Sequence, residues 1–123
     1  MARLSTVTPG GAPHVVAIVF AIAGDVAWTA IDAKPKSTRA LRRLANIAAN
    51  PRVSLLVDVY DDDWSRLWWV RLDGVATVLS ADDAGAATGV AALVAKYPQY
   101  RADPPAGPLI WISVERRVSW SAR

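Results

Sequence analysis

A single helical segment interrupts a series of strand-like segments, and it limits the possible folds more than any other feature of the chain. Residues 34–52 read KPKSTRALRRLANIAANPR. Four apolar residues recur at helical spacing and predict the face that packs on the rest of the chain: Leu41, Leu44, Ala45 and Ala48. Four polar residues are expected on the opposite face: Arg39, Arg42, Arg43 and Asn46. Ser37 or Thr38 is a suitable N-cap, and Asn50-Pro51 ends the helix because the residue before a proline avoids helical angles.

The entrance to this helix is basic. Lys34 and Lys36 lie just before the expected N-terminus, where several backbone N–H groups lack helical partners. Ammonium groups beside free N–H donors make a good phosphate site, because helix N-termini attract anions. The alternative is a basic helix face that contacts only solvent, and this segment alone does not decide between the two.

Six strands are predicted from alternation or from runs of β-branched and apolar residues. They cover residues 3–8, 14–23, 26–31, 53–60, 67–79 and 109–114, with a possible extension of the last to residue 120. Asp73-Gly74 predicts a bulge or turn within the fifth strand. Strands joined as hairpins, with one helix between the third and the fourth, favour a mainly β fold. We expect a small antiparallel barrel with about two helices packed outside it.

A second helix is predicted over residues 81–96. Ser80 would cap it, with Asp83 as the second member of a capping box. Gly85 and Gly89 weaken the helix by about 1 kcal/mol each relative to alanine, but small residues also permit close packing on a sheet. Residues 101–108 are expected to form a proline-rich loop.

Composition limits the class of protein. With 123 residues, of which 53% are hydrophobic and 20% charged, we expect one packed domain over residues 1–123. The absence of cysteine excludes disulfides, thiolate metal sites and cysteine nucleophiles. The longest apolar run, residues 15–23, is too short to span a bilayer, and Met1 leads into strand-like sequence without a signal peptide pattern. We therefore expect a cytoplasmic protein without a membrane partner.

The net charge of +3 is concentrated before and within the first helix, which suggests an anionic partner. A small phosphorylated ligand satisfies this charge as well as nucleic acid does. There is no glycine-rich phosphate loop with the spacing of a Rossmann or P-loop site.

Few residues are candidates for catalysis or metal binding. His14 is the only histidine, and no nucleophile or base is paired with it in the sequence. Asp61, Asp62 and Asp63 are adjacent, which is more typical of a solvated loop than of a cation site. We therefore predict no metal site and assign no catalytic residue.

Tryptophans beside arginines suggest a site for a flat ring. Trp64, Trp68 and Trp69 lie close to Arg66 and Arg71. In a strand, Trp68 and Trp69 point to opposite faces, so one can fill the core while the other lines a groove or a subunit interface. An aromatic wall beside a cation suits a conjugated ring with a phosphate, or stacked nucleic-acid bases, although core and dimer packing would also explain each tryptophan.

Taken together, these segments resemble the pyridoxamine 5'-phosphate oxidase-like split-barrel superfamily. More narrowly, the chain is similar to the actinobacterial oxidoreductases of that fold that depend on the deazaflavin coenzyme F420. The resemblance rests on three segments in order: TVTPGGAPHVVAIVF, KPKSTRALRRLANIAANPRVSLLVD and LWWVRLDGVATVL. It implies a six-stranded antiparallel split β-barrel, and it covers nearly the whole chain.

The resemblance also implies residue roles. Lys36 matches a lysine that contacts the cofactor phosphate, Lys34 lies two residues earlier, and Ser37 and Thr38 could donate to the same oxygens. Trp69 stands where the oxidase proper has a glutamine that touches the isoalloxazine, a departure from simple flavin oxidases. The arginines of the helix, Arg42 among them, suit the anionic polyglutamate tail of F420.

The function implied is hydride transfer between reduced F420 and a small unsaturated or quinone-like substrate, in a homodimer with two cofactor sites at the subunit interface. The proton could come from solvent, Tyr60 or His14. Three alternatives remain: an FMN-binding protein of the same fold, a non-enzymatic cofactor-binding, storage or haem-binding protein, and a basic barrel that binds nucleic acid.

Overall fold

The structure is a computed structural model that describes residues 1–31 and 38–122, and it describes side chains up to residue 31 and from residue 42. Seven strands occur in these ranges: β1 (Ala2–Val7), β2 (Pro13–Ile18), β3 (Ala21–Ala23), β4 (Val26–Ala30), β5 (Arg52–Val59), β6 (Trp68–Leu79) and β7 (Leu109–Ser121). Three α-helices accompany them: α1 (Thr38–Ala49), α2 (Ala87–Lys96) and α3 (Pro98–Ala102). Two short 3-10 helices lie at Trp64–Arg66 and Ala84–Ala86.

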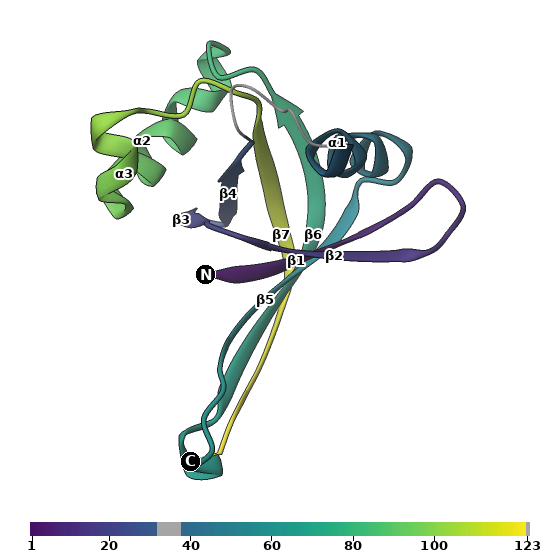
Figure 1. Cartoon of the computed structure of the whole chain (residues 1–123), viewed down its shortest axis with the longest axis vertical. Helices are drawn as coiled ribbons and strands as arrows, with labels where there is room; N and C mark the ends of the chain where they lie inside the picture. Colours follow the sequence, from purple (N-terminus) through teal and green to yellow (C-terminus); the bar gives the residue numbers. More distant parts are fainter. Residues whose placement is uncertain (32–37, 123) are drawn as a thin grey trace.

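All seven strands form one antiparallel sheet in the order β2-β1-β5-β6-β7-β4-β3. Figure 1 shows β1 and β2 running across β6 and β7, so the sheet is strongly curled. The helices pack outside it, α1 beside one end of β6 and α2 with α3 beside β3 and β4 (Figure 1). The predicted mainly β class, with antiparallel strands and flanking helices, is confirmed.

The predicted strand over residues 14–23 is divided in two. β2 pairs with β1 at one edge of the sheet, whereas β3 pairs with β4 at the other edge. The chain therefore crosses between the two edges at residues 19–20, and the hydroxyl of Thr29 supports the crossing by donating to the carbonyl oxygen of Val19 at 2.8 Å. This crossing curls the sheet into a half-open barrel and gives seven strands instead of six.

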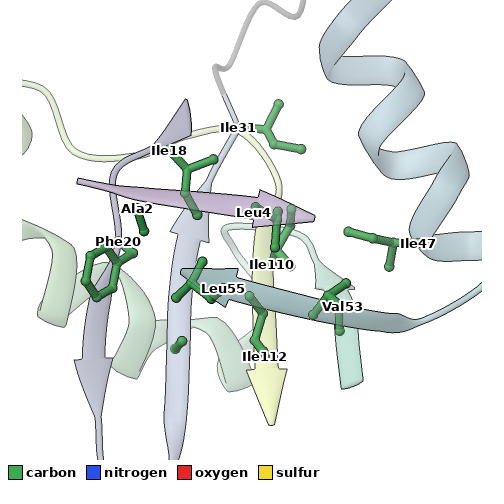
Figure 2. Close-up of a cluster of buried hydrophobic side chains, with 12 residues drawn as sticks. Ala2, Leu4, Ile18, Phe20, Ile31, Ile47, Val53, Leu55, Ile110 and Ile112 are labelled. Carbon is green, nitrogen blue, oxygen red and sulfur yellow. The ribbon is translucent and has the colours of Figure 1, made fainter. Parts of the chain in front are cut away.

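The core lies inside the curl. Its buried side chains come from most strands and from α1: Ala2, Leu4, Ile18, Phe20, Ala27, Ile31, Ile47, Val53, Leu55, Ala76, Ile110 and Ile112 (Figure 2). A smaller cluster joins α2 to β3 and β4 around Trp28. Gly89 is the residue of α2 that permits this approach, because a Cβ there would lie 2.2 Å from Cε3 of Trp28. The expectation that a small residue lets this helix pack closely on the sheet is confirmed at Gly89.

The buried face of α1 differs from the predicted one. Asn46 is 1% exposed and Ile47 is buried, whereas Ala45 and Ala48 are exposed. The polar Asn46 can be buried because its Nδ2 donates to Oγ1 of Thr6 at 3.0 Å. The helix therefore turns its asparagine toward β1, and the prediction that Asn46 lies on the polar face is wrong.

The second helical region also begins later than predicted. α2 starts at Ala87, after a 3-10 turn whose cap is Asp83, because the Asp83 carboxylate accepts from the backbone N–H of Gly85. The predicted capping role of Ser80 is thus wrong. The expected proline-rich loop is preceded by α3, which has Pro98 at its first position, where the missing N–H costs nothing.

β6 is one strand with a bulge at Asp73/Gly74, as predicted, and β7 continues to Ser121. Beyond the bulge, β5, β6 and β7 extend away from the barrel as a three-stranded arm, which we define as residues 56–59, 68–71 and 118–121. Figure 1 shows the arm at the opposite end of the molecule from α1.

Candidate functional site

The predicted phosphate segment lies largely outside the described residues. This applies to Lys34, Lys36 and Ser37, and to the side chain of Thr38. Thr38 opens α1, as expected, and the first turn of α1 contains no acidic residue that would offset its positive end. Arg42 is exposed on the helix surface.

The framework on both sides of this segment is fixed. Before it, the backbone N–H of Ile31 donates to the carbonyl oxygen of Pro108 at 2.8 Å. After it, the bond from Asn46 to Thr6 holds α1 against β1. The described residues on each side of the segment are therefore both bonded to the rest of the fold.

Trp69 lies in an aromatic recess on the arm. It is the register partner of Trp120 on β7, and on β5 it is paired with Asp58. The recess has a volume of about 450 Å³ and a mostly apolar wall made by Leu56, Asp58, Val59, Tyr60, Leu67, Trp68, Trp69, Arg71 and Trp120. Volume and lining both suit a flat conjugated ring.

The charges beside the recess are paired. Arg71 holds Asp73 with two hydrogen bonds, Nε to Oδ1 at 3.0 Å and Nη2 to Oδ2 at 3.2 Å. The Ser54 hydroxyl donates to the same carboxylate at 2.8 Å, and this bond is the largest cause that lowers the pKa of Asp73, ahead of Arg71 and Arg116. Arg3 and Asp58 form a further pair at 2.8 Å. The bonds to Asp73 therefore favour its ionised form.

A polar groove of about 500 Å³ lies on the same face of the sheet. Its charged lining consists of Arg52, Asp73, Glu115 and Arg116, with Ser5 and Ser54 between them. In the register of β5 and β6, Ser54 lies opposite Asp73 in the groove, and Asp58 lies opposite Trp69 in the recess. Alternate residues of a strand point to the same face, and each of these pairs is separated from the other by an even number of residues. The groove and the recess therefore lie on the same face of the sheet. We refer to this surface as the recess face.

The recess and α1 are far apart within one chain. The end of α1 meets β6 near Ala76, whose N–H donates to the carbonyl oxygen of Pro51. Seven residues of extended strand separate Ala76 from Trp69, which corresponds to about 23 Å. Figure 1 shows the whole of α1 and the arm at opposite ends of the molecule. One chain therefore does not bring Trp69 next to the start of α1.

The other candidate residues have local partners. Asp61 accepts from the backbone N–H of Asp63, and the Asp63 carboxylate accepts from the N–H and the hydroxyl of Ser65, which lowers the pKa of Asp63. These bonds organise a turn at the tip of the arm. Among the described residues, no three histidine or carboxylate side chains are grouped so that they could hold a metal ion. His14 lies in β2, paired with Thr6 and away from the recess.

Sequence reasoning missed a second pocket, on the opposite face of the arm. It is lined by Phe20, Ile22, Val57, Trp68, Val70, Leu72, Val114 and Arg117, together with the turn residues Gly24 and Asp25. The alternation of Trp68 and Trp69 was the available signal, because it predicts an aromatic residue on each face of β6. The residues that line this pocket together with Trp68 come from strands distant in the sequence, and no local sequence pattern predicts that they meet.

Comparison with known proteins agrees with this architecture. The sequence profile of the family described as pyridoxamine 5'-phosphate oxidase matches residues 1–121. No curated protein matches the sequence. In the described ranges, no helix has the length and apolar character needed to cross a bilayer.

Solved structures share the fold at low sequence identity. A conserved hypothetical protein of Mycobacterium tuberculosis superimposes with a TM-score of 0.76 and 23% identity, covering 99% of this chain and 77% of that one. HutZ, the haem storage protein of Vibrio cholerae, superimposes with a TM-score of 0.74 and 17% identity, covering 98% of this chain and 84% of that one. An FAD-binding protein of Mesorhizobium loti superimposes with a TM-score of 0.71 and 20% identity, covering 96% of this chain and 83% of that one. With a profile match over almost its whole length, this chain belongs to the pyridoxamine 5'-phosphate oxidase-like split-barrel superfamily.

Proposed function

We propose that this protein is an F420-dependent oxidoreductase that transfers a hydride between the reduced deazaflavin and a small unsaturated or quinone-like substrate. The observation that carries the proposal is the basic entrance to α1. Lys34 and Lys36 precede a helix whose first turn has no acidic residue, and Arg42 follows on its exposed surface. This arrangement suits a phosphate at the helix start and a longer anionic tail along the helix.

The second half of the proposed site is the aromatic recess. Its apolar walls and its volume of about 450 Å³ fit a deazaflavin ring, and Trp69 and Trp120 would shield that ring from water. The cofactor supplies the hydride when it is bound, while the protein binds and orients it. Tyr60 is the better placed of the two candidate proton donors, because it lines the recess whereas His14 does not.

A complete site requires a second copy of the chain. The ribityl chain that joins a deazaflavin ring to its phosphate is much shorter than the separation of Trp69 from α1 within one chain. We therefore place the phosphate on the basic segment of one subunit and the ring against Trp69 of its partner, so that a homodimer has two cofactor sites at its interface.

The recess face has the properties of such an interface. Trp120 is 47% exposed and Val15 is 61% exposed on this surface of the sheet, and exposed apolar side chains of this size favour burial against a partner. The ion pairs Arg3–Asp58 and Arg71–Asp73 place charges of both signs on this face. In a twofold dimer, positive groups of one subunit can then lie opposite negative groups of the other.

FMN is the second candidate cofactor, because it also presents a flat ring and a phosphate. The likeness to an FAD-binding protein supports a flavin, and the likeness to a haem storage protein supports a non-enzymatic binding role, but only at the level of the fold. The tryptophan at position 69 and the arginines of α1 favour F420.

Fluorescence titration of the purified protein with F420 and with FMN tests the proposal. We expect saturable F420 binding, and we expect Lys36→Ala to weaken it by about 10–100-fold, because a charge-assisted phosphate contact contributes roughly 1.5–3 kcal/mol. Arg101→Gln is the control for net charge, since Arg101 lies on α3, at the other side of the barrel. Because its guanidinium also donates to the carbonyl oxygens of Val94 and Ala95, circular dichroism checks that this variant stays folded. Saturable binding of FMN alone would support the second candidate, and binding of neither would refute both F420 and FMN as cofactors.

A further inference from the structure

The pocket opposite the aromatic recess has the form of a second binding site. It has a volume of about 380 Å³ and is lined mainly by apolar side chains of the arm and of the crossing at residues 19–20. Gly24 and Asp25 at its rim precede β4, whereas the basic segment follows the other end of β4. The pocket is therefore separate from the proposed phosphate site of its own chain.

One wall of this pocket is fixed by an unusual set of bonds to Phe20. The Tyr97 hydroxyl accepts from the backbone N–H of Phe20 at 3.0 Å and donates to its carbonyl oxygen at 2.8 Å. Lys96 donates to the same carbonyl oxygen at 2.7 Å, and its Nζ lies 3.8 Å from the centre of the Phe20 ring. The Tyr97 hydroxyl thus bonds to the backbone of Phe20 between β2 and β3, where the chain has no neighbouring strand among the described residues to pair with. Phe20 lies at the edge of the core in Figure 2, and these bonds hold it in place.

The rim carries a cation that has no ion-pair partner among the described residues. Arg117 lies opposite Leu72 in the register and lines the pocket, and it forms no salt bridge or side-chain hydrogen bond with the described residues. Arg116 lies opposite Asp73 and lines the polar groove on the other face. Because successive residues of a strand point to opposite faces, the two neighbouring arginines lie at two different sites.

We propose that this pocket binds a small apolar acid, with its apolar body against Phe20 and Trp68 and its single negative charge on Arg117. A cavity of this size with apolar walls excludes water from a ring or an aliphatic body. Arg117 supplies the polar contact that fixes the orientation of such a ligand. Asp25 on the same rim disfavours ligands with several negative charges, because it would repel the second one. The proposal does not depend on the identity of the redox cofactor.

Two fluorescent probes test it on the full chain: anilinonaphthalene sulfonate, which is anionic, and phenylnaphthylamine, its uncharged counterpart. Because the aromatic recess also suits a flat ring, the titrations use the Trp69→Ala variant, in which we expect one saturable site per chain for each probe. Arg117→Gln should weaken binding of the sulfonate about fivefold, as for a partly exposed ion pair, and leave binding of the neutral probe unchanged. Tyr97→Phe should weaken both probes, because it releases Phe20.

Arg116→Gln is the matched control, since it removes the same charge from the adjacent residue on the other face of the strand. Circular dichroism confirms that each variant is folded. Equal effects of Arg116→Gln and Arg117→Gln would overturn the proposal, because they would indicate non-specific attraction. Absence of saturable binding would also overturn it. Displacement of the sulfonate by F420 would show that the pocket belongs to the cofactor site, and would equally refute a separate site.

Discussion

Gly74 lies at the bulge that separates the barrel from the arm, and Gly74→Ala should be strongly destabilising. A Cβ at this position would lie 2.2 Å from the carbonyl oxygen of Ser113 and 3.0 Å from its carbonyl carbon. These atoms belong to the backbone of β7, so no side-chain rotation relieves the contact. β6 and β7 have to move apart at the point where Glu115 forms the extra residue of the bulge.

The magnitude follows from these contacts. Overpacking of a close-packed site costs about 1–3 kcal/mol, and the rigidity of a backbone neighbour places Gly74→Ala at the upper end. A lost ladder hydrogen bond adds about 1 kcal/mol. We therefore expect the free energy of unfolding to fall by about 4 kcal/mol, and Tm to fall by roughly 15 °C for a chain of this size.

Urea denaturation followed by tryptophan fluorescence measures this loss. Thr77→Ala is the control on the same strand, because Thr77 is exposed and its replacement should change the free energy of unfolding by less than about 1 kcal/mol. A Gly74→Ala protein as stable as the Thr77→Ala control would refute the reasoning, because the two strands would then not approach as closely as the structure indicates.

Three further predictions concern the helix, the carboxylate beside the recess and the proposed interface. Asn46→Ala should lower the free energy of unfolding by about 1–3 kcal/mol in urea denaturation, because it removes the partner of a buried hydroxyl; an unchanged midpoint would contradict the buried bond to Thr6. Asp73 has a lowered pKa, so its stabilisation is present above the unfolded-state value near 3.8 and is lost as the pH falls through the folded-state value. Asp73→Asn should therefore reduce the acid dependence of stability, and an unaltered pH profile would argue against the bonds from Ser54 and Arg71. Trp120→Ser should shift the protein toward monomer in sedimentation velocity, whereas the exposed Thr88→Ala on α2 should not; equal behaviour would argue against the recess face as the interface.

Local sequence patterns predicted most of the strands and the class of fold. The β-branched and apolar runs gave β5, β6 and β7 to within a few residues, and Asp73-Gly74 marked the bulge. These features depend on neighbours in the sequence, because alternation, turns and propensity are local. The division of residues 14–23 into β2 and β3 was not predictable in the same way. The run is apolar from Val15 to Ala23, and the side chains that bond to the backbone where it divides, Thr29 and Tyr97, are supplied by β4 and by the end of α2.

The orientation of α1 shows the same limit. Helical spacing predicted an apolar face through Ala45 and Ala48, but the buried bond to Thr6, from a strand 40 residues earlier, turns Asn46 inward instead. The aromatic recess was predicted only in part. Trp69 was identified, whereas Trp120 joins it through the register of β6 and β7, which the sequence does not specify. Lys34, Lys36 and Ser37 stay predictions, since they lie outside the described residues.

The central claim is that each cofactor site combines the basic segment of one subunit with the tryptophan recess of the other. Mixing two variants with weakened F420 binding, Lys36→Ala and Trp69→Ala, tests it most directly through F420 titration of isolated mixed dimers. If the two residues serve one site from different subunits, each mixed dimer has one site with both residues intact, and tight F420 binding returns at one site per dimer. If both residues serve a site within the same subunit, every site in the mixed dimer stays defective, and the absence of tight binding would contradict the account.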